Sequence, residues 1–141
     1  MNCTIEHIAA DNYVKIVVEG VFSIEEHAEC VNELFSSPFW KPGMNLLCDY
    51  QNFNFGSVIF EKVRAASENY QRAPEKLGKG KMALVVKTKL GFGIGRQFEL
   101  ISEGKIPREI YVFMDEKEAI DWLLNLPKES KMPIESLLSE I

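Results

Sequence analysis

The spacing of apolar residues along the chain predicts strands and helices in a regular order. Residues 82–86 are apolar without interruption and are bounded by lysines, a pattern typical of a strand covered on both faces. Because such a strand has no face that meets water, we expect the other elements to pack around it. Shorter runs predict further strands at residues 5–8, 13–19, 44–50 and 109–113.

Between the later strands, apolar residues recur at intervals of three and four, which indicates helices with one buried face. Ser23 and Glu26 form a capping box, so the first helix should begin there and continue to about Phe35. Further helices are expected after Ser57, after a glycine-rich turn at residues 91–95, and after Asp115, which can cap the last helix.

This alternation of strand and helix predicts the class of fold. Consecutive strand-helix-strand units require parallel strands, right-handed crossovers and helices that cover the sheet. The Asp-Asn pair at residues 11–12 suits a tight turn, so the first two strands should form a hairpin. We therefore expect an α/β fold with a mixed, mostly parallel sheet of about five strands and an antiparallel N-terminal hairpin. The pattern leaves the strand order open.

Residues 1–126 are expected to form this domain, and residues 127–141 a polar linker and a short helix. Such a helix would carry an apolar stripe formed by Ile134, Leu137, Leu138 and Ile141. A helix this short needs a surface to pack against, either on the same chain or on a second copy. We favour the second copy, and hence a homodimer.

Composition narrows the classes of function. The 141 residues carry a net charge of −5, which argues against broad binding to nucleic acid or to anionic membranes. No apolar run reaches the roughly 20 residues that cross a bilayer, and the N-terminus lacks the pattern of a signal peptide, so we expect a cytoplasmic protein. Cys3, Cys30 and Cys48 are far apart and match no Cys-x-x-Cys spacing. We expect reduced thiols, with no disulfide, metal site or cofactor.

Residues with recognisable catalytic chemistry are scarce. Both histidines lie within the first 27 residues, and no serine, cysteine or lysine stands in a familiar arrangement with a base. His27 borders the apolar stripe of the first helix and is interpreted as a residue at the rim of the core. A small hydrolase or transferase is therefore the least favoured of the functions considered.

Ligands of parallel sheets bind at the edge where the strands have their carboxyl ends. Residues 76–98 include lysines and an arginine but no acidic residue, and a helix start nearby would offer free amides to an anion. Phenylalanines in the loops at this edge can line a pocket. The glycines can alternatively serve only a tight turn and close helix packing. The expected ligand-binding residues are Asp49, Asn52, Phe53, Phe55, Lys87, Thr88, Lys89, Gly91, Phe92, Gly93, Gly95 and Arg96.

One run of residues resembles a known family. Phe113, Asp115, Ala119, Trp122 and Leu123 are similar to the closing strand and helix of SpoIIAA-like proteins, which are related to STAS domains and have been compared with SEC14 lipid carriers. The resemblance extends in element order over roughly residues 4–124. It implies a STAS-like fold.

The resemblance also draws attention to Ser57. In STAS domains that antagonise anti-sigma factors, a serine at a helix start is phosphorylated, and the matching position lies near Ser57. Here Gly56 replaces the aspartate that usually precedes that serine. Ser57 can alternatively act only as the N-cap of its helix, which is the interpretation we favour.

These observations lead to one favoured function and one alternative. The favoured function is a non-catalytic STAS-like module that binds a small anionic or amphipathic ligand at the carboxyl edge of the sheet. The resemblance to SEC14 carriers implies a lipid-like ligand as one version. The alternative is a protein-interaction module that switches regulatory partners through the helix after Ser57.

Overall fold

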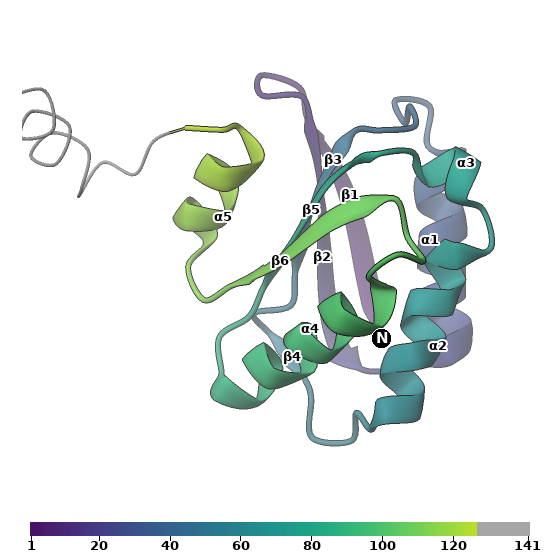
Figure 1. The fold of residues 1–141 in the computed structure, drawn as a ribbon, viewed down its shortest axis with the longest axis vertical. Coiled ribbons are helices and arrows are strands. Elements are labelled where there is room, and N and C mark those ends of the chain that lie inside the picture. The colour runs from purple at the N-terminus through teal and green to yellow at the C-terminus, as the bar shows by residue number, and fades with distance from the viewer. Residues whose placement is uncertain (127–141) are drawn as a thin grey trace, which may run out of the picture.

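The computed structural model of the chain describes residues 1–126, which form a sheet with helices on both faces (Figure 1). The linker, helix and dimer contact predicted for residues 127–141 lie outside the described residues. No helix among residues 1–126 is long and apolar enough to cross a membrane. The elements in chain order are β1 (Asn2–Ile8), β2 (Tyr13–Val21), α1 (Ile24–Ser36), β3 (Asn45–Asp49), β4 (Phe53–Asn54), α2 (Phe60–Gln71), α3 (Pro74–Leu77), β5 (Gly80–Val85), α4 (Lys89–Ser102), β6 (Arg108–Phe113) and α5 (Glu116–Leu123).

The strands form a mixed sheet whose main path runs in the order β1-β2-β3-β5-β6. β1 is antiparallel to β2, and the later pairs along this path are parallel. The predicted α/β class and the antiparallel N-terminal hairpin are therefore confirmed. The sequence pattern missed two short elements: β4, a strand of two residues that pairs with the end of β2, and α3, a helix of four residues.

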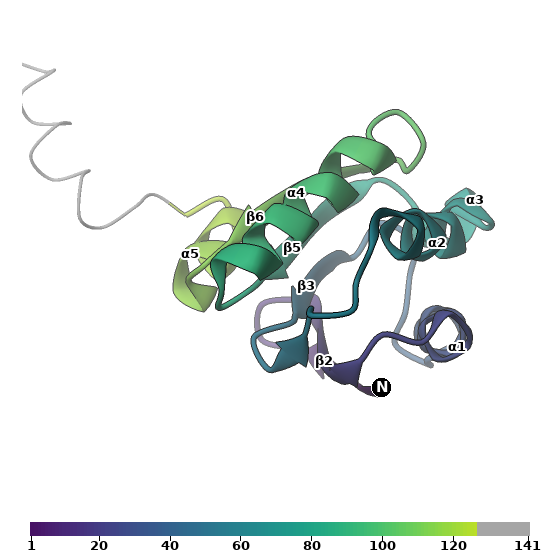
Figure 2. The same ribbon diagram turned by 90° about the horizontal axis from the view of Figure 1, so that it is seen from below.

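Alternation along the strands divides the core into two parts. In β3, Leu46 and Cys48 belong to the larger part with residues of α1, α2 and α4, whereas Leu47 packs with Ala119 and Leu123 of α5. Figure 2 shows α1 and α2 on one side of the sheet and α5 on the other. The larger apolar volume therefore lies on the face that α1, α2 and α4 cover.

Two of the predicted helix caps are present. Ser23 Oγ accepts a hydrogen bond from Glu26 N at 3.2 Å, and Asp115 Oδ1 accepts one from Lys117 N at 3.0 Å. The Glu26 carboxylate, which the capping box would direct to the Ser23 amide, instead forms an ion pair of 2.8 Å with the N-terminal ammonium of Met1. This ion pair ties the start of α1 to the start of β1.

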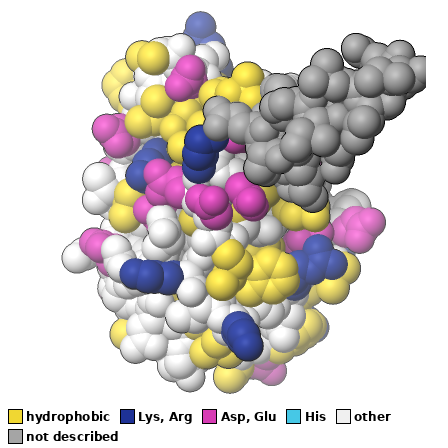
Figure 3. All heavy atoms as spheres, turned by 90° about the vertical axis from the view of Figure 1, so that its left-hand side faces the viewer, with side chains coloured by type: hydrophobic (Ala, Val, Ile, Leu, Met, Phe, Trp, Pro, Cys, Tyr) yellow, Lys and Arg dark blue, Asp and Glu magenta, His cyan; other side chains and the backbone are white. Residues whose placement is uncertain are grey.

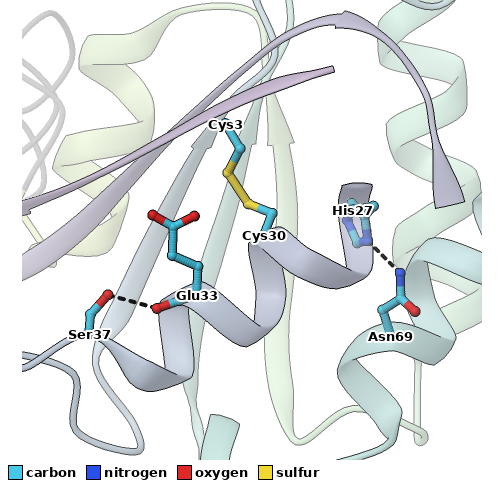
Figure 4. The surroundings of a disulfide bond; sticks show 6 residues. All are labelled: Cys3, His27, Cys30, Glu33, Ser37 and Asn69. Carbon is cyan, nitrogen blue, oxygen red and sulfur yellow. Dashed lines mark hydrogen bonds between the residues drawn. A yellow bond between two sulfur atoms is a disulfide. The ribbon is translucent and has the colours of Figure 1, made fainter. Parts of the chain in front are cut away.

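The cysteines correct one expectation. Cys3 in β1 and Cys30 in α1 form a disulfide, with their Cα atoms 6.2 Å apart (Figure 4). Our expectation of reduced thiols was wrong for this pair, because short-range spacing says nothing about residues that a strand and a helix bring together. Cys48 is free and buried, as expected.

His27 corrects a second expectation. It is 4% exposed and lies inside the core, not at its rim. Asn69 Nδ2 donates a hydrogen bond to His27 Nδ1 at 2.8 Å (Figure 4). Burial lowers the pKa of His27 to about 4, so the ring is neutral at physiological pH. The sequence pattern placed His27 beside the apolar stripe of α1 and could not show that α2 packs over it.

Arg108 joins several elements by hydrogen bonds at the edge where the parallel strands begin. Its guanidinium donates to four backbone carbonyl oxygens at distances of 2.6 to 3.0 Å. Those oxygens belong to Met44, Leu77, Gly78 and Lys81. Burial lowers the pKa of Arg108 to about 10, so the side chain keeps its charge at neutral pH. One side chain thus joins α3 and the starts of β3, β5 and β6.

Candidate functional site

A cavity of about 60 Å³ lies between the sheet and the helices α2 and α4, near the carboxyl ends of β3 and β5. Its walls are almost entirely apolar. The strands supply Cys48, Met82 and Leu84, the segment after β3 supplies Tyr50, Phe53 and Phe55, and the helices supply Val63, Ala66, Tyr70, Ile94 and Phe98. The cavity lies at the sheet edge where parallel architectures place their ligands.

Aromatic side chains close one end of this cavity. The rings of Phe53 and Phe55 lie 5.0 Å apart, and those of Tyr50 and Phe53 lie 5.3 Å apart, both in edge-to-face geometry. The short strand β4 positions them, because Phe53 pairs with Gly20 at the end of β2. The loop that the sequence predicted here is therefore fixed by the sheet.

The glycine-rich segment does not form the predicted turn. α4 already begins at Lys89, and Thr88 caps it by accepting a hydrogen bond from Gly91 N at 3.0 Å. A Cβ atom at Gly91 would lie 2.9 Å from the Phe55 ring, and one at Gly95 would lie 3.0 Å from both methyl groups of Val112. These two glycines therefore let α4 approach the cavity wall and the sheet. A Cβ at Gly93 would meet nothing within 4 Å.

Three hydrogen-bonding side chains line the cavity in neutral form. A hydrogen bond joins the Cys48 thiol to the Tyr70 hydroxyl, and burial raises the pKa of Cys48 to about 12. Burial also raises the pKa values of Tyr50 and Tyr70 above their usual range. At neutral pH the thiol is therefore protonated and is not an activated nucleophile.

Lys62 is the cation in the cavity lining. Its ammonium group donates a hydrogen bond to the Ser57 carbonyl oxygen at 3.0 Å. The side chain is half-buried and lies in the first turn of α2, which begins beside the cavity. A positive charge next to apolar walls can receive the anionic end of a ligand.

The predicted ligand-binding residues separate into three groups. Phe53, Phe55 and Gly95 line the cavity, and Gly91 contacts Phe55. Exposed residues of the same edge are Asn52, Lys87, Thr88, Lys89, Phe92, Gly93 and Arg96. The remaining residue, Asp49, faces the α5 side, where its carboxylate lies 4.0 Å from Lys15 Nζ, and Lys15 also pairs with Glu116 at 3.3 Å. Asp49 therefore lies on the face of the sheet opposite the cavity.

Ser57 lies in an exposed turn before α2 and does not cap it. The N-cap of α2 is Ile59, which supplies no side-chain hydrogen bond. Our preferred interpretation of Ser57 as a helix cap was therefore wrong. Phosphorylation of Ser57 stays a prediction.

Sequence reasoning missed the contribution of α2 to the site. The spacing of Val63, Ala66 and Tyr70 by three and four residues indicates a helix face turned to the core, but such a stripe cannot show that the packing beneath it leaves a cavity. The sequence contained one indication of a site on this helix, since Lys62 is a charged residue next to that apolar stripe. Among residues 1–126, no group of three or more histidine, cysteine, aspartate or glutamate residues is placed to hold a metal ion.

Comparisons with known proteins identify the fold. No protein-family model matches the chain, and no curated protein matches it either. A crystal structure of an uncharacterized protein of the DUF3478 family from Shewanella loihica, described as having a SpoIIAA-like fold, matches with a TM-score of 0.59. The match covers 86% of this chain and 92% of the other at 18% identity. The chain has a SpoIIAA-like fold, as its closing strand and helix had indicated.

Proposed function

We propose that the chain is a STAS-like binding module that takes a small amphipathic ligand at the carboxyl edge of its sheet and carries out no reaction on it. The observation that carries this proposal is the apolar cavity behind Phe53 and Phe55, with Lys62 in its wall. Apolar walls favour an apolar guest, because its transfer out of water is favourable and because an unfilled cavity lacks dispersion contacts.

The size of the cavity limits how much of a ligand it can hold. Its volume of about 60 Å³ is less than half that of the roughly 150 Å³ apolar cavity that admits benzene in another protein. The apolar end of a ligand therefore enters, and the rest stays at the edge. A longer chain would require the rings of Phe53 and Phe55 to move apart.

Lys62 favours a ligand with an anionic group. Its ammonium group bonds a neutral carbonyl oxygen, Ser57 O, and a carboxylate or phosphate oxygen would make a stronger charge-assisted hydrogen bond in the same place. Lys87 and Lys89 are exposed at the start of α4 on the same edge and add to the positive potential. A fatty-acid-like molecule combines the required apolar tail and anionic head.

The test is titration of the protein with decanoate, decanol and sulfate, followed by the amide shifts in NMR spectra. We expect decanoate to bind best and to shift residues of α2 and α4. Ala66→Leu fills the cavity and should abolish binding of decanoate and decanol. Ala65→Leu is the matched control, because Ala65 lies on the same helix but does not line the cavity. Lys62→Gln should weaken decanoate binding and leave decanol binding unchanged.

Equal decanoate binding by Ala66→Leu and Ala65→Leu would contradict the proposal. Sulfate binding as strong as that of decanoate, lost in Arg96→Ala, would favour instead the anion site predicted at the start of α4.

Partner switching through Ser57 remains the second candidate. The exposed hydroxyl is open to a kinase, and Lys62 next to the Ser57 backbone could pair with an added phosphate. A pull-down of partners with Ser57→Asp and Ser57→Ala tests this function. Loss of one specific protein with the aspartate variant alone would support it, and identical partners for both variants would argue against it.

A further inference from the structure

The edge around the cavity carries large apolar side chains that are exposed to solvent. Ile59 and Phe60 at the start of α2 are 59% and 48% exposed, and Leu90 and Phe92 at the start of α4 are 55% and 38% exposed. Both helices begin at the lower edge in Figure 1, where the parallel strands end. Apolar side chains grouped in this way are typical of a surface that contacts a partner.

The two helix starts lie beside the same cavity. Phe55, five residues before α2, packs so closely on Gly91 that a Cβ atom there would lie 2.9 Å from its ring. Val58 from the segment before α2 and Ile94 from α4 line the same cavity. Most of the exposed apolar residues therefore flank the cavity from two sides, and we call them, with the lysines beside them, the edge surface. It consists of Ile59, Leu90, Phe92, Lys87 and Lys89. Phe60 is not part of it, because its ring lies against the Arg64 guanidinium and lines a hollow with Ile101 and Lys105 at the other end of α4.

Positive charge accompanies this surface. Lys87 and Lys89 are exposed at the start of α4, and no acidic residue lies between Lys76 and Phe98. Glu61 in the first turn of α2 is the acidic residue nearest in sequence to Ile59 and Phe60. In the lower part of Figure 3, hydrophobic side chains lie beside lysine or arginine side chains, whereas most acidic ones lie higher. The edge surface thus contains two lysines and no carboxylate of its own, and the acidic residues beside it are Glu61 and Asp115, which follows β6 next to the end of β5.

We propose that the edge surface docks the protein on an anionic lipid surface. Apolar side chains next to basic ones are the combination that binds at a membrane interface, where the former enter the boundary of the acyl chains and the latter meet anionic headgroups. The net charge of −5 opposes broad adsorption, so docking depends on this one orientation. Two copies of the edge surface would bring like charges together, which disfavours a second copy as the partner.

The experiment is co-sedimentation of the full chain with vesicles of equal parts phosphatidylcholine and phosphatidylglycerol, and with vesicles of phosphatidylcholine alone. We expect binding to the anionic vesicles that added salt weakens. Leu90→Asp and Ile59→Asp should abolish it. Leu100→Asp is the matched control, because Leu100 is 60% exposed on the same helix but lies about 15 Å farther along its axis.

The basic residues have a separate test. The double variant Lys87→Gln, Lys89→Gln should bind about 30-fold more weakly, since each lysine near an anionic surface contributes roughly a fivefold gain. All five residues changed to Asp or Gln are exposed, so unchanged thermal unfolding of these variants serves as the check on folding.

Three results would overturn the proposal: no binding of the wild type to anionic vesicles, equal binding of Leu90→Asp and Leu100→Asp, or a dimer in light scattering that Leu90→Asp makes monomeric. The proposal does not depend on the ligand function. Ala66→Leu, which fills the cavity, should still bind vesicles, so the two ideas can fail separately.

Discussion

Reduction of the disulfide between Cys3 and Cys30 should lower the stability of the fold substantially. The bond joins residues that are 27 positions apart, and in the chain-entropy description a closed loop of this length contributes about 3.5 kcal/mol to the free energy of unfolding. Unfolding a domain of this size changes the entropy by roughly 0.3 kcal/mol/K, so the melting temperature should fall by about 12 °C.

Thermal unfolding followed by circular dichroism, with and without a reductant, measures this change on an unaltered sequence. A thiol count on the unfolded protein should find one free thiol per chain without reductant, that of Cys48, and three with it. Cys48→Ala controls for the remaining thiol and should show the same difference on reduction. A melting temperature that does not change, although the thiol count rises, would refute the entropic reasoning.

The same experiment bears on the compartment in which the protein works. The sequence led us to expect a cytoplasmic protein, and thioredoxin and glutathione keep most cytosolic thiols reduced. If reduction lowers the free energy of unfolding by several kcal/mol, the protein is less stable in a reducing compartment by the same amount. Isolation of the chain under conditions that trap thiols would show which form exists in the cell.

Two further predictions concern the core. His27 has a pKa of about 4 in the folded protein, which is below its value in the unfolded chain. Its contribution to the free energy of unfolding, about 3 kcal/mol, is therefore fully present above pH 6.5 and is lost as the pH falls toward 4. Urea unfolding at several pH values should show this loss, and the His27→Gln variant should not show it. Gly95→Ala should lower the stability of the fold by about 1 kcal/mol, because crowding of the new methyl group against Val112 outweighs the gain in helix propensity. Gly93→Ala places its methyl group in open space and should raise the stability by about 0.5 to 1 kcal/mol. Chemical denaturation compares the two variants, and an equal gain in both would show that the Val112 side chain moves to make room.

The sequence predicted most of the fold because its elements follow local rules. The apolar run at residues 82–86 and the capping residue Ser23 each determine structure through neighbours in the chain, and both predictions agree with the structure. β4 was not predicted because a strand of two residues is too short to show an alternation of apolar and polar positions. The disulfide was not predicted because it joins β1 to α1, and the spacing of cysteines along the chain does not show which of them lie close together in the fold.

The candidate site was predicted only in part, for a similar reason. Phe53 and Phe55 attracted attention as apolar residues in a loop, and they line the cavity. The glycines of α4 were wrongly assigned to a turn. Glycine is a poor helix former, and the sequence alone does not show that the Phe55 ring and Val112 leave no room for larger side chains at Gly91 and Gly95. Tertiary packing overrides propensity at such positions.

Arg108 and Lys15 join elements at opposite edges of the sheet through different kinds of partner. The four partners of Arg108 are backbone carbonyl oxygens, which carry no charge. Lys15 in β2 instead pairs with the carboxylates of Asp49 in β3 and Glu116 in α5. Added salt, which screens the attraction between charges, should therefore weaken the contacts of Lys15 more than those of Arg108.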